Sequence, residues 1–156
     1  MEELRRLTNE TIHLAVAEPP SMLLVERLES THPVRYVEAL GGLSPMALTS
    51  TGRASLSTMP EDMIIEVLEK EPRCADPKQR DHIMRAVRQA ATDGYATTSE
   101  WRDGVFATAA AITWNAAPVP PPALSISAPE TRMTSEKRAL HAQLVIEATQ
   151  TIQSKF

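Results

Sequence analysis

Apolar and β-branched residues gather in short runs over the first part of the chain, which is the pattern of β-strands. Two clear runs cover residues 11–16 and 22–28, and the sequence Glu-Pro-Pro-Ser at 18–21 separates them. Because proline fixes φ and has no N–H to give to a ladder, this connection favours a reversal of the chain, and we expect a hairpin. A third strand is predicted at residues 34–38, where polar and apolar side chains alternate.

Helical periodicity replaces the strand pattern after the glycine pair at 41–42. A short helix with a hydroxyl cap is expected within residues 49–56. After Pro60, apolar residues recur every three or four positions and acidic residues occupy the other face, which predicts a second helix. A third helix is predicted to start at Asp76, an N-cap followed by proline, and to end at Gly94.

Strand-like segments return at residues 95–98, 105–112 and 123–127. Alanine in the middle segment favours helix, but that segment is short and its apolar residues alternate with small ones. We therefore interpret it as a strand. The proline-rich residues 118–122 are predicted to form a loop between neighbouring strands rather than a free polyproline segment.

A C-terminal amphipathic helix is predicted from residue 134 onward, because a capping-type Thr-Ser-Glu-Lys sequence is followed by apolar residues at helical spacing. Those apolar residues are Leu140, Leu144, Ala148 and Ile152. Strands, helices, strands and a final helix follow one another in this order. The order argues for a single α/β domain, with a largely antiparallel sheet of roughly six strands and flanking helices.

The composition limits what such a domain can do. The chain has 156 residues, and its formal net charge of −4 offers no basic patch for a phosphate backbone, so we do not expect it to bind DNA by itself. Its only cysteine, Cys74, cannot form a disulfide within the chain, which suits a reducing, cytoplasmic location. No apolar run approaches the roughly 18 residues that a bilayer requires, and no membrane partner is expected.

Candidate catalytic groups are few and scattered. The 4 histidines, at positions 13, 32, 82 and 141, form no short-spaced pair, so we expect no metal site and no cofactor. Cys74 lies near acidic residues, which disfavour a reactive thiolate. No nucleophile elbow, dinucleotide fingerprint or phosphate loop occurs. We therefore do not expect an enzyme.

Hydroxyl side chains offer a different kind of chemistry. Ser125 and Ser127 share one face of the last predicted strand, while Leu124 and Ile126 share the other. The two serines fit a solvated sheet face, which periodicity alone favours. They also fit a pocket whose hydroxyl groups orient a small polar ligand. Both interpretations stay open at this level.

Several sequence blocks occur in an order and spacing that resemble the C-terminal domain of IclR-type (isocitrate-lyase-regulator) transcriptional regulators. The similarity extends from about Leu4 to the final helix. It rests on residues 13–16, 25–30, 41–45 with Thr49, Gly52-Arg53-Ala54, 93–96, Glu100-Trp101, Gly104-Val105, Ala109-Ala110 with Ile112, 123–129 and 132–134. Each block is weak alone, but their order and spacing together are specific.

The resemblance implies a sheet of the profilin and GAF type that binds an effector on one face, beneath the segment 44–53. Nine positions match the family's pocket, and most carry hydroxyl groups. They are Tyr36, Ser44, Ser50, Thr51, Thr98, Val105, Ala107, Ser125 and Ser127. Such neutral donors suit a small organic acid or an aromatic metabolite.

The resemblance also implies a division of the chain and a function. We expect residues 1–10 to be the remnant of an interdomain linker helix and residues 11–156 to be the effector-binding domain. The family's winged helix-turn-helix is absent from this sequence, so DNA would be contacted only through such a missing part. The expected function is effector binding and homodimer or tetramer formation, with the effector altering subunit arrangement and operator affinity in the full-length protein.

The sequence departs from the family pattern at several positions. Relatives usually carry histidine where this chain has Ala47, an acidic residue near Thr98 or Ser99, and proline where it has Ala111. The proline run at 118–122 replaces an Asp-x-x-Gly turn. These departures motivate an alternative in which the chain is a stand-alone or degenerate domain that acts only in protein–protein association.

Overall fold

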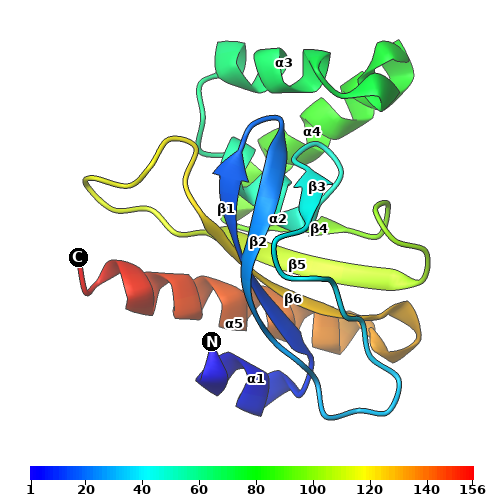
Figure 1. Ribbon diagram of the computed structural model, residues 1–156, viewed down its shortest axis with the longest axis vertical. Coiled ribbons are helices and arrows are strands. Elements are labelled where there is room, and N and C mark those ends of the chain that lie inside the picture. Colours follow the sequence, from blue (N-terminus) through cyan, green and yellow to red (C-terminus); the bar gives the residue numbers. More distant parts are fainter.

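Six strands form one antiparallel sheet in the order β3-β2-β1-β6-β5-β4 (Figure 1). The computed structural model describes residues 1–156. The strands are β1 (Thr11–Glu18), β2 (Ser21–Leu28), β3 (Leu43–Pro45), β4 (Ala96–Thr98), β5 (Val105–Ala111) and β6 (Ala123–Pro129). Pairing of β1 with β6 joins the two halves of the chain at the centre of the sheet. The single α/β domain with a six-stranded antiparallel sheet is confirmed.

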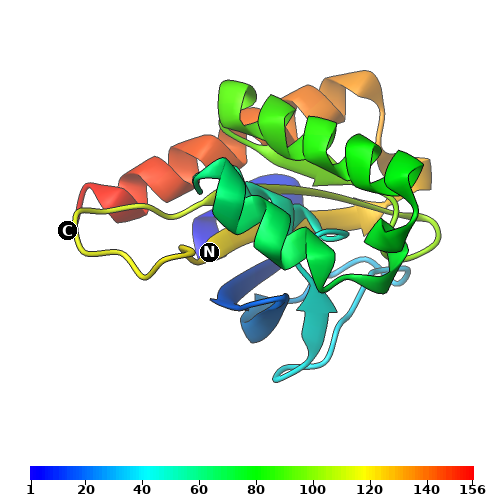
Figure 2. The same cartoon turned by 90° about the horizontal axis from the view of Figure 1, so that it is seen from above.

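Helices cover both faces of this sheet, as Figures 1 and 2 show from two directions. The helical segments are α1 (Glu2–Thr8), α2 (Ser50–Leu56), α3 (Glu61–Glu69), η1 (Pro72–Ala75), α4 (Pro77–Asp93), η2 (Glu130–Arg132) and α5 (Ser135–Gln153). Helices α1 and α5 lie on one face, and α2 lies on the other with α3 and α4 packed around it. None of the helices combines the length and the apolar character that a membrane span requires.

Alternation along the strands supplies a separate core to each face. On β6, Leu124 and Ile126 point towards α5 and join a cluster with Leu4 and Val145. Ala123, one position away, belongs to the larger cluster on the α2 face. Successive strand residues point to opposite faces, so β6 is buried on both sides. Leu124 and Ile126 belong to the core beneath α5, and Ser125 and Ser127 point towards the α2 face.

The helix boundaries follow from capping residues that the sequence displays. Thr49 Oγ1 accepts a hydrogen bond from the Gly52 N–H at 3.2 Å and starts α2. Asp76 accepts from the Lys78 N–H at 3.0 Å and starts α4, which ends at Gly94 with φ of 81°. These side chains satisfy N–H groups that a helix start leaves without partners. The predicted hairpin, four helices and last three strands are confirmed to within a few residues.

The strand predicted at residues 34–38 is wrong. The third strand is β3, further along the chain, and it pairs with β2 through Leu23 and Leu43. The carbonyl groups of residues 34–38 are bound by side chains instead of a ladder: Thr11 Oγ1 donates to Tyr36 O, and Arg132 donates to Val34 O, both at 2.8 Å. Polar and apolar side chains alternate in this loop, and Tyr36 points into the interior of the domain although no neighbouring strand pairs with the segment.

The buried stripe of α5 also differs in detail from the prediction. Helix α5 is present, but its fully buried centre is Val145, and Leu140 is 45% exposed. Leu144, Ala148 and Ile152 pack at the edge of the cluster on this face. The long apolar residues therefore flank the contact with the sheet rather than forming its middle.

The loop at residues 118–122 connects β5 to β6, as predicted. It is fixed from the α2 side, because Ser55 Oγ donates a hydrogen bond to Pro121 O at 2.6 Å. At its end, the Ile112 N–H donates to Pro122 O at 2.8 Å and continues the ladder beyond β5. The loop thus binds α2 to the sheet edge.

Among the glycines, Gly52 permits the closest approach of another backbone segment. A Cβ atom placed there would lie 2.2 Å from the Cα and the carbonyl oxygen of Met46. Backbone atoms at that distance cannot be relieved by a rotamer change. The absence of a side chain at Gly52 therefore determines how closely the 46–49 segment packs on α2.

We predict that Gly52→Ala lowers the free energy of unfolding by about 3 kcal/mol or more, the upper range for overpacking. Gly94→Ala is the matched control, since its Cβ would meet only Ile146 Cδ1 at 3.9 Å. That control should lose about 1 kcal/mol through its left-handed backbone alone. Urea denaturation measures both variants. Equal losses would show that the contact with Met46 is not the constraint.

Candidate ligand-binding pocket

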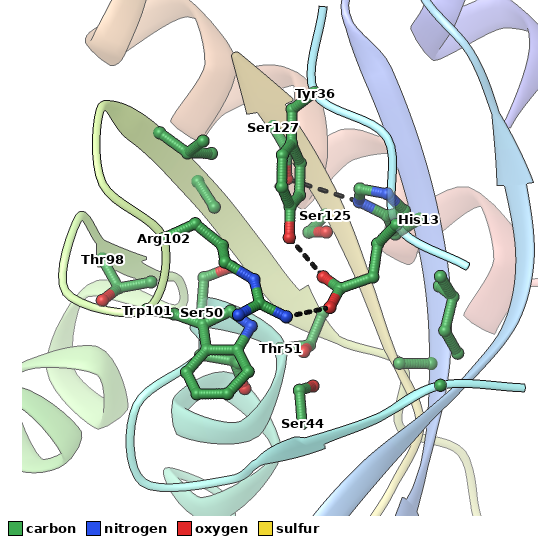
Figure 3. Close-up of a pocket in the computed structure, with 17 residues that line it drawn as sticks. His13, Tyr36, Ser44, Ser50, Thr51, Thr98, Trp101, Arg102, Ser125 and Ser127 are labelled. Atoms are coloured by element: carbon green, nitrogen blue, oxygen red, sulfur yellow. Dashed lines mark hydrogen bonds and ion pairs between the residues drawn. The ribbon is translucent and has the colours of Figure 1, made fainter. Parts of the chain in front are cut away.

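A cavity lies on the α2 face of the sheet, beside the first turn of α2 and between the loops at residues 29–42 and 99–104 (Figure 3). Its volume is about 560 Å³, part of it open to solvent, and 17 residues line it. The strands supply the floor, and the two loops form the mouth.

All of the positions assigned from the family resemblance lie around this one cavity. Ser125 and Ser127 come from β6, Val105 and Ala107 from β5, and Thr98 from the end of β4. The opposite wall is formed by residues from the 29–42 loop, β3 and α2: Tyr36, Ser44, Ser50 and Thr51. The structure thus brings nine scattered positions together, and their contact with a ligand stays a prediction.

Besides Thr49, the N-cap of α2, four polar or charged residues that the sequence did not indicate line the cavity: His13, Glu38, Trp101 and Arg102. His13 could have been found from strand pairing, because it lies opposite Ser125 in the β1–β6 register. Directly opposed residues in a sheet point to the same face. The other three belong to loops, where no periodicity indicates the direction of a side chain.

The hydroxyl groups on the walls fall into two sets. Thr98 Oγ1 donates to Leu48 O at 3.0 Å and accepts from the Glu100 N–H at 3.1 Å, so internal hydrogen bonds already occupy it. In Figure 3 a second set has no hydrogen bond to any other residue drawn: Ser44, Ser50, Thr51 and Ser125. The second set is free to bind polar groups of a ligand.

His13 is a buried polar group of the cavity. It is 5% exposed, and its Nδ1 lies 3.3 Å from Ser127 Oγ. Its Nε2 is buried without any hydrogen-bond partner. Burial, assisted by the positive charge of Arg27 and opposed by Glu38, lowers the pKa of His13 to about 4 from its ordinary 6.5. The imidazole is therefore neutral at pH 7 and leaves one nitrogen for a ligand.

A chain of charged and phenolic groups crosses the mouth of the pocket. The Tyr36 hydroxyl donates to one oxygen of Glu38, and Arg102 Nη2 donates to the other at 3.1 Å. The Arg102 guanidinium also lies 4.3 Å from the centre of the Trp101 ring. Burial and the hydrogen bond to the Glu38 carboxylate raise the pKa of Tyr36, so the phenol stays protonated.

An ion pair with a buried arginine connects α2 to the 99–104 loop beside the pocket. Arg53, on α2, is 2% exposed; its Nε donates to Ala47 O at 2.8 Å, and its Nη2 reaches Glu100 at 3.0 Å. Burial would raise the pKa of Glu100, but the hydrogen bonds from Arg53 and His82 outweigh it and lower that pKa. The pair holds the 99–104 loop against α2.

The structure offers no metal-binding group, since no three His, Cys, Asp or Glu side chains come together. Cys74 is buried in the core of the α2 face, and burial raises the pKa of its thiol. A buried thiol with a raised pKa is a poor nucleophile. The chemistry of the cavity is therefore hydrogen bonding and ion pairing.

A protein family described as the C-terminal domain of bacterial transcriptional regulator IclR matches residues 1–154 of this chain. The chain belongs to the IclR family. The curated relatives that it matches are transcriptional regulators. The match covers every element of the sheet and every residue around the pocket, so the pocket lies in the C-terminal domain of an IclR-type protein.

Individual IclR relatives are distant but cover the whole domain. The regulator KdgR of Escherichia coli is 24% identical over 160 residues, covering 100% of this chain and 61% of KdgR, so the chain spans about three fifths of that relative. The solved C-terminal domain of E. coli KdgR has a TM-score of 0.81 at 23% identity, covering 99% of this chain and 92% of that one. An IclR homologue from Microbacterium hydrocarbonoxydans, solved in complex with 4-hydroxybenzoate, has a TM-score of 0.80 at 24% identity. The match covers 99% of this chain and 63% of the homologue.

We predict that His13 makes the IclR domain less stable in mild acid. The unfolded chain takes up a proton on this residue near pH 6.5, whereas the folded protein does so only near pH 4. The stability contributed by neutral His13 is therefore complete above about pH 6.5 and is lost as the pH falls towards 4.

Urea denaturation of the wild type and His13→Gln at pH 7 and pH 5 measures this contribution. The difference in unfolding free energy between the two proteins should change by about 2 kcal/mol between these pH values, in favour of the variant at pH 5. A constant difference would mean that His13 is protonated equally in the folded and unfolded states.

Proposed function

We propose that this domain senses a small organic acid or polar aromatic metabolite, and that the cavity on the α2 face is the effector site. One observation carries the proposal: a cavity lined partly by apolar side chains holds several unpartnered hydroxyl groups and the unpartnered Nε2 of His13. A buried polar atom without a partner costs free energy. A ligand that binds these groups recovers that cost.

The walls favour a flat or compact ligand with polar groups at its edges. The apolar part of the lining comes mainly from small or branched side chains: Ala15, Leu24, Val105 and Ala107. Such side chains contact an aromatic or aliphatic skeleton, and the hydroxyl groups around them orient its polar substituents. The complex of the Microbacterium hydrocarbonoxydans homologue with 4-hydroxybenzoate supports this choice of ligand class.

The regulatory part of the proposal follows from family membership. In a full-length regulator, the effector would change the arrangement of subunits in a homodimer or tetramer and thereby the affinity of a separate DNA-binding part for its operator. This requires the effector to bind two arrangements with different affinities. The 29–42 and 99–104 loops form the mouth of the pocket and are the segments whose positions a ligand affects first.

The test is a thermal-shift screen of small organic acids and aromatic compounds that includes 4-hydroxybenzoate. A ligand at 100 times its Kd adds about 2.7 kcal/mol of stability, which raises Tm by several degrees for a domain of this size. Ser125→Ala and Ser127→Ala should weaken binding about fivefold, the loss of one hydrogen bond.

Ser135→Ala, on the exposed first turn of α5, is the control and should bind like the wild type. If both pocket variants are stabilised as much as the wild type, the serines are not part of the site. If no compound stabilises the wild type, the alternative gains support, in which the domain acts only in protein–protein association.

A further inference from the structure

The charged lining of the pocket consists of one cation and one anion. Among the 17 lining residues, Arg102 is the only arginine or lysine and Glu38 is the only aspartate or glutamate. They are bonded to each other at 3.1 Å across the mouth, although 64 positions separate them in the chain. Figure 3 shows Arg102 close to Tyr36 and Trp101. In this structure the one positive charge of the pocket is paired with its one negative charge.

Glu38 is held more firmly than Arg102. The Tyr36 hydroxyl donates to its second oxygen, and the Glu38 backbone oxygen accepts from Arg27. Its side chain is 22% exposed, whereas that of Arg102 is 49% exposed and contacts the flat face of Trp101. A guanidinium has five N–H donors in one plane and can bind two carboxylates in turn without leaving a stacked position. Arg102 is therefore the partner that can exchange.

An incoming carboxylate and an incoming neutral ligand meet this ion pair differently. A carboxylate is repelled by Glu38 and attracted by Arg102, so it gains most when Arg102 turns from Glu38 towards it. A neutral ligand gains little from breaking the pair. The ion pair thus distinguishes carboxylates from neutral ligands, while the hydroxyl groups below it can contact ligands of both classes.

We propose that Arg102 recognises the carboxylate of the effector by exchange with Glu38, so that Glu38 acts as a built-in competitor. This inference rests on the proposed function of the pocket and adds the residue that sets its preference for acids. The exchange also releases the only direct ion pair between the 29–42 and 99–104 loops. Binding of an acid therefore loosens the mouth of the pocket, and binding of a neutral analogue does not.

The experiment uses matched acids and amides: 4-hydroxybenzoate with 4-hydroxybenzamide, and lactate with lactamide. Kd is measured by calorimetry for the wild type, Arg102→Gln, Arg102→Lys and Glu38→Gln. Arg102→Gln should weaken binding of the acids about tenfold or more and leave the amides within about twofold. Arg102→Lys should recover part of the loss, and Glu38→Gln should strengthen binding of the acids.

Arg102→Gln should weaken acid binding and Glu38→Gln should strengthen it, and this difference in sign distinguishes carboxylate recognition from a structural role of the ion pair. Arg102→Gln and Glu38→Gln remove the same bond, so a purely structural role predicts similar losses for acid and amide in both variants. That result overturns the exchange, as does weaker acid binding in Glu38→Gln. Arg85→Gln and Glu69→Gln, exposed on α4 and α3, control for the change in net charge and should bind like the wild type.

Failure of this inference and failure of the proposed function give different results. If only the neutral compounds bind, and Ser125→Ala weakens them, the effector pocket stands and the carboxylate exchange is wrong. If neither the acids nor the amides bind to the wild type, the exchange is overturned, and the effector pocket is retained only if another compound of the screen binds.

Discussion

The buried guanidinium of Arg53 is the group on which the rest of the site depends. It is 2% exposed and connects the 46–49 segment, through Ala47 O, to the 99–104 loop, through both oxygens of Glu100. An arginine at such a position is stable only if its charge and its N–H groups have partners, because an unpaired buried charge costs several kcal/mol. The 46–49 segment and the backbone of the 99–104 loop are therefore fixed relative to each other, whereas the exposed side chain of Arg102 lies outside this ion pair.

The same constraint keeps the cavity on the α2 face of the sheet open. On the α5 face, large side chains such as Leu124, Ile126 and Val145 fill the space between sheet and helix. On the α2 face the strands carry mostly small residues at the pocket, and α2 cannot move closer to fill the gap. Gly52 against Met46, Ser55 against Pro121 and Arg53 against Glu100 hold it in place. The side chains beside α2 therefore do not fill the space above the sheet, and a ligand can occupy it.

The sequence was most informative where regular structure repeats. Caps at Thr49 and Asp76, and alternation along β6, are local signals, and they located the elements and the two-faced character of the last strand. The spacing of sequence blocks placed nine positions in one pocket, because relatives share a three-dimensional arrangement that a single pattern cannot encode. The 34–38 segment was misjudged, since its carbonyls are bound by Thr11 and Arg132 from elsewhere in the chain. Glu38 and Arg102 were missed for a related reason: their significance depends on two irregular loops meeting across the pocket.

Whether the α2 face of this IclR domain holds an effector is decided by where a bound ligand lies. The measurement is a crystal structure of the chain grown with the organic acid that stabilises it most. We expect electron density for the acid between β6 and the first turn of α2, within hydrogen-bond distance of Ser125. Density for the acid on the α1 and α5 side, with the space beside Ser125 empty, would overturn the proposed site.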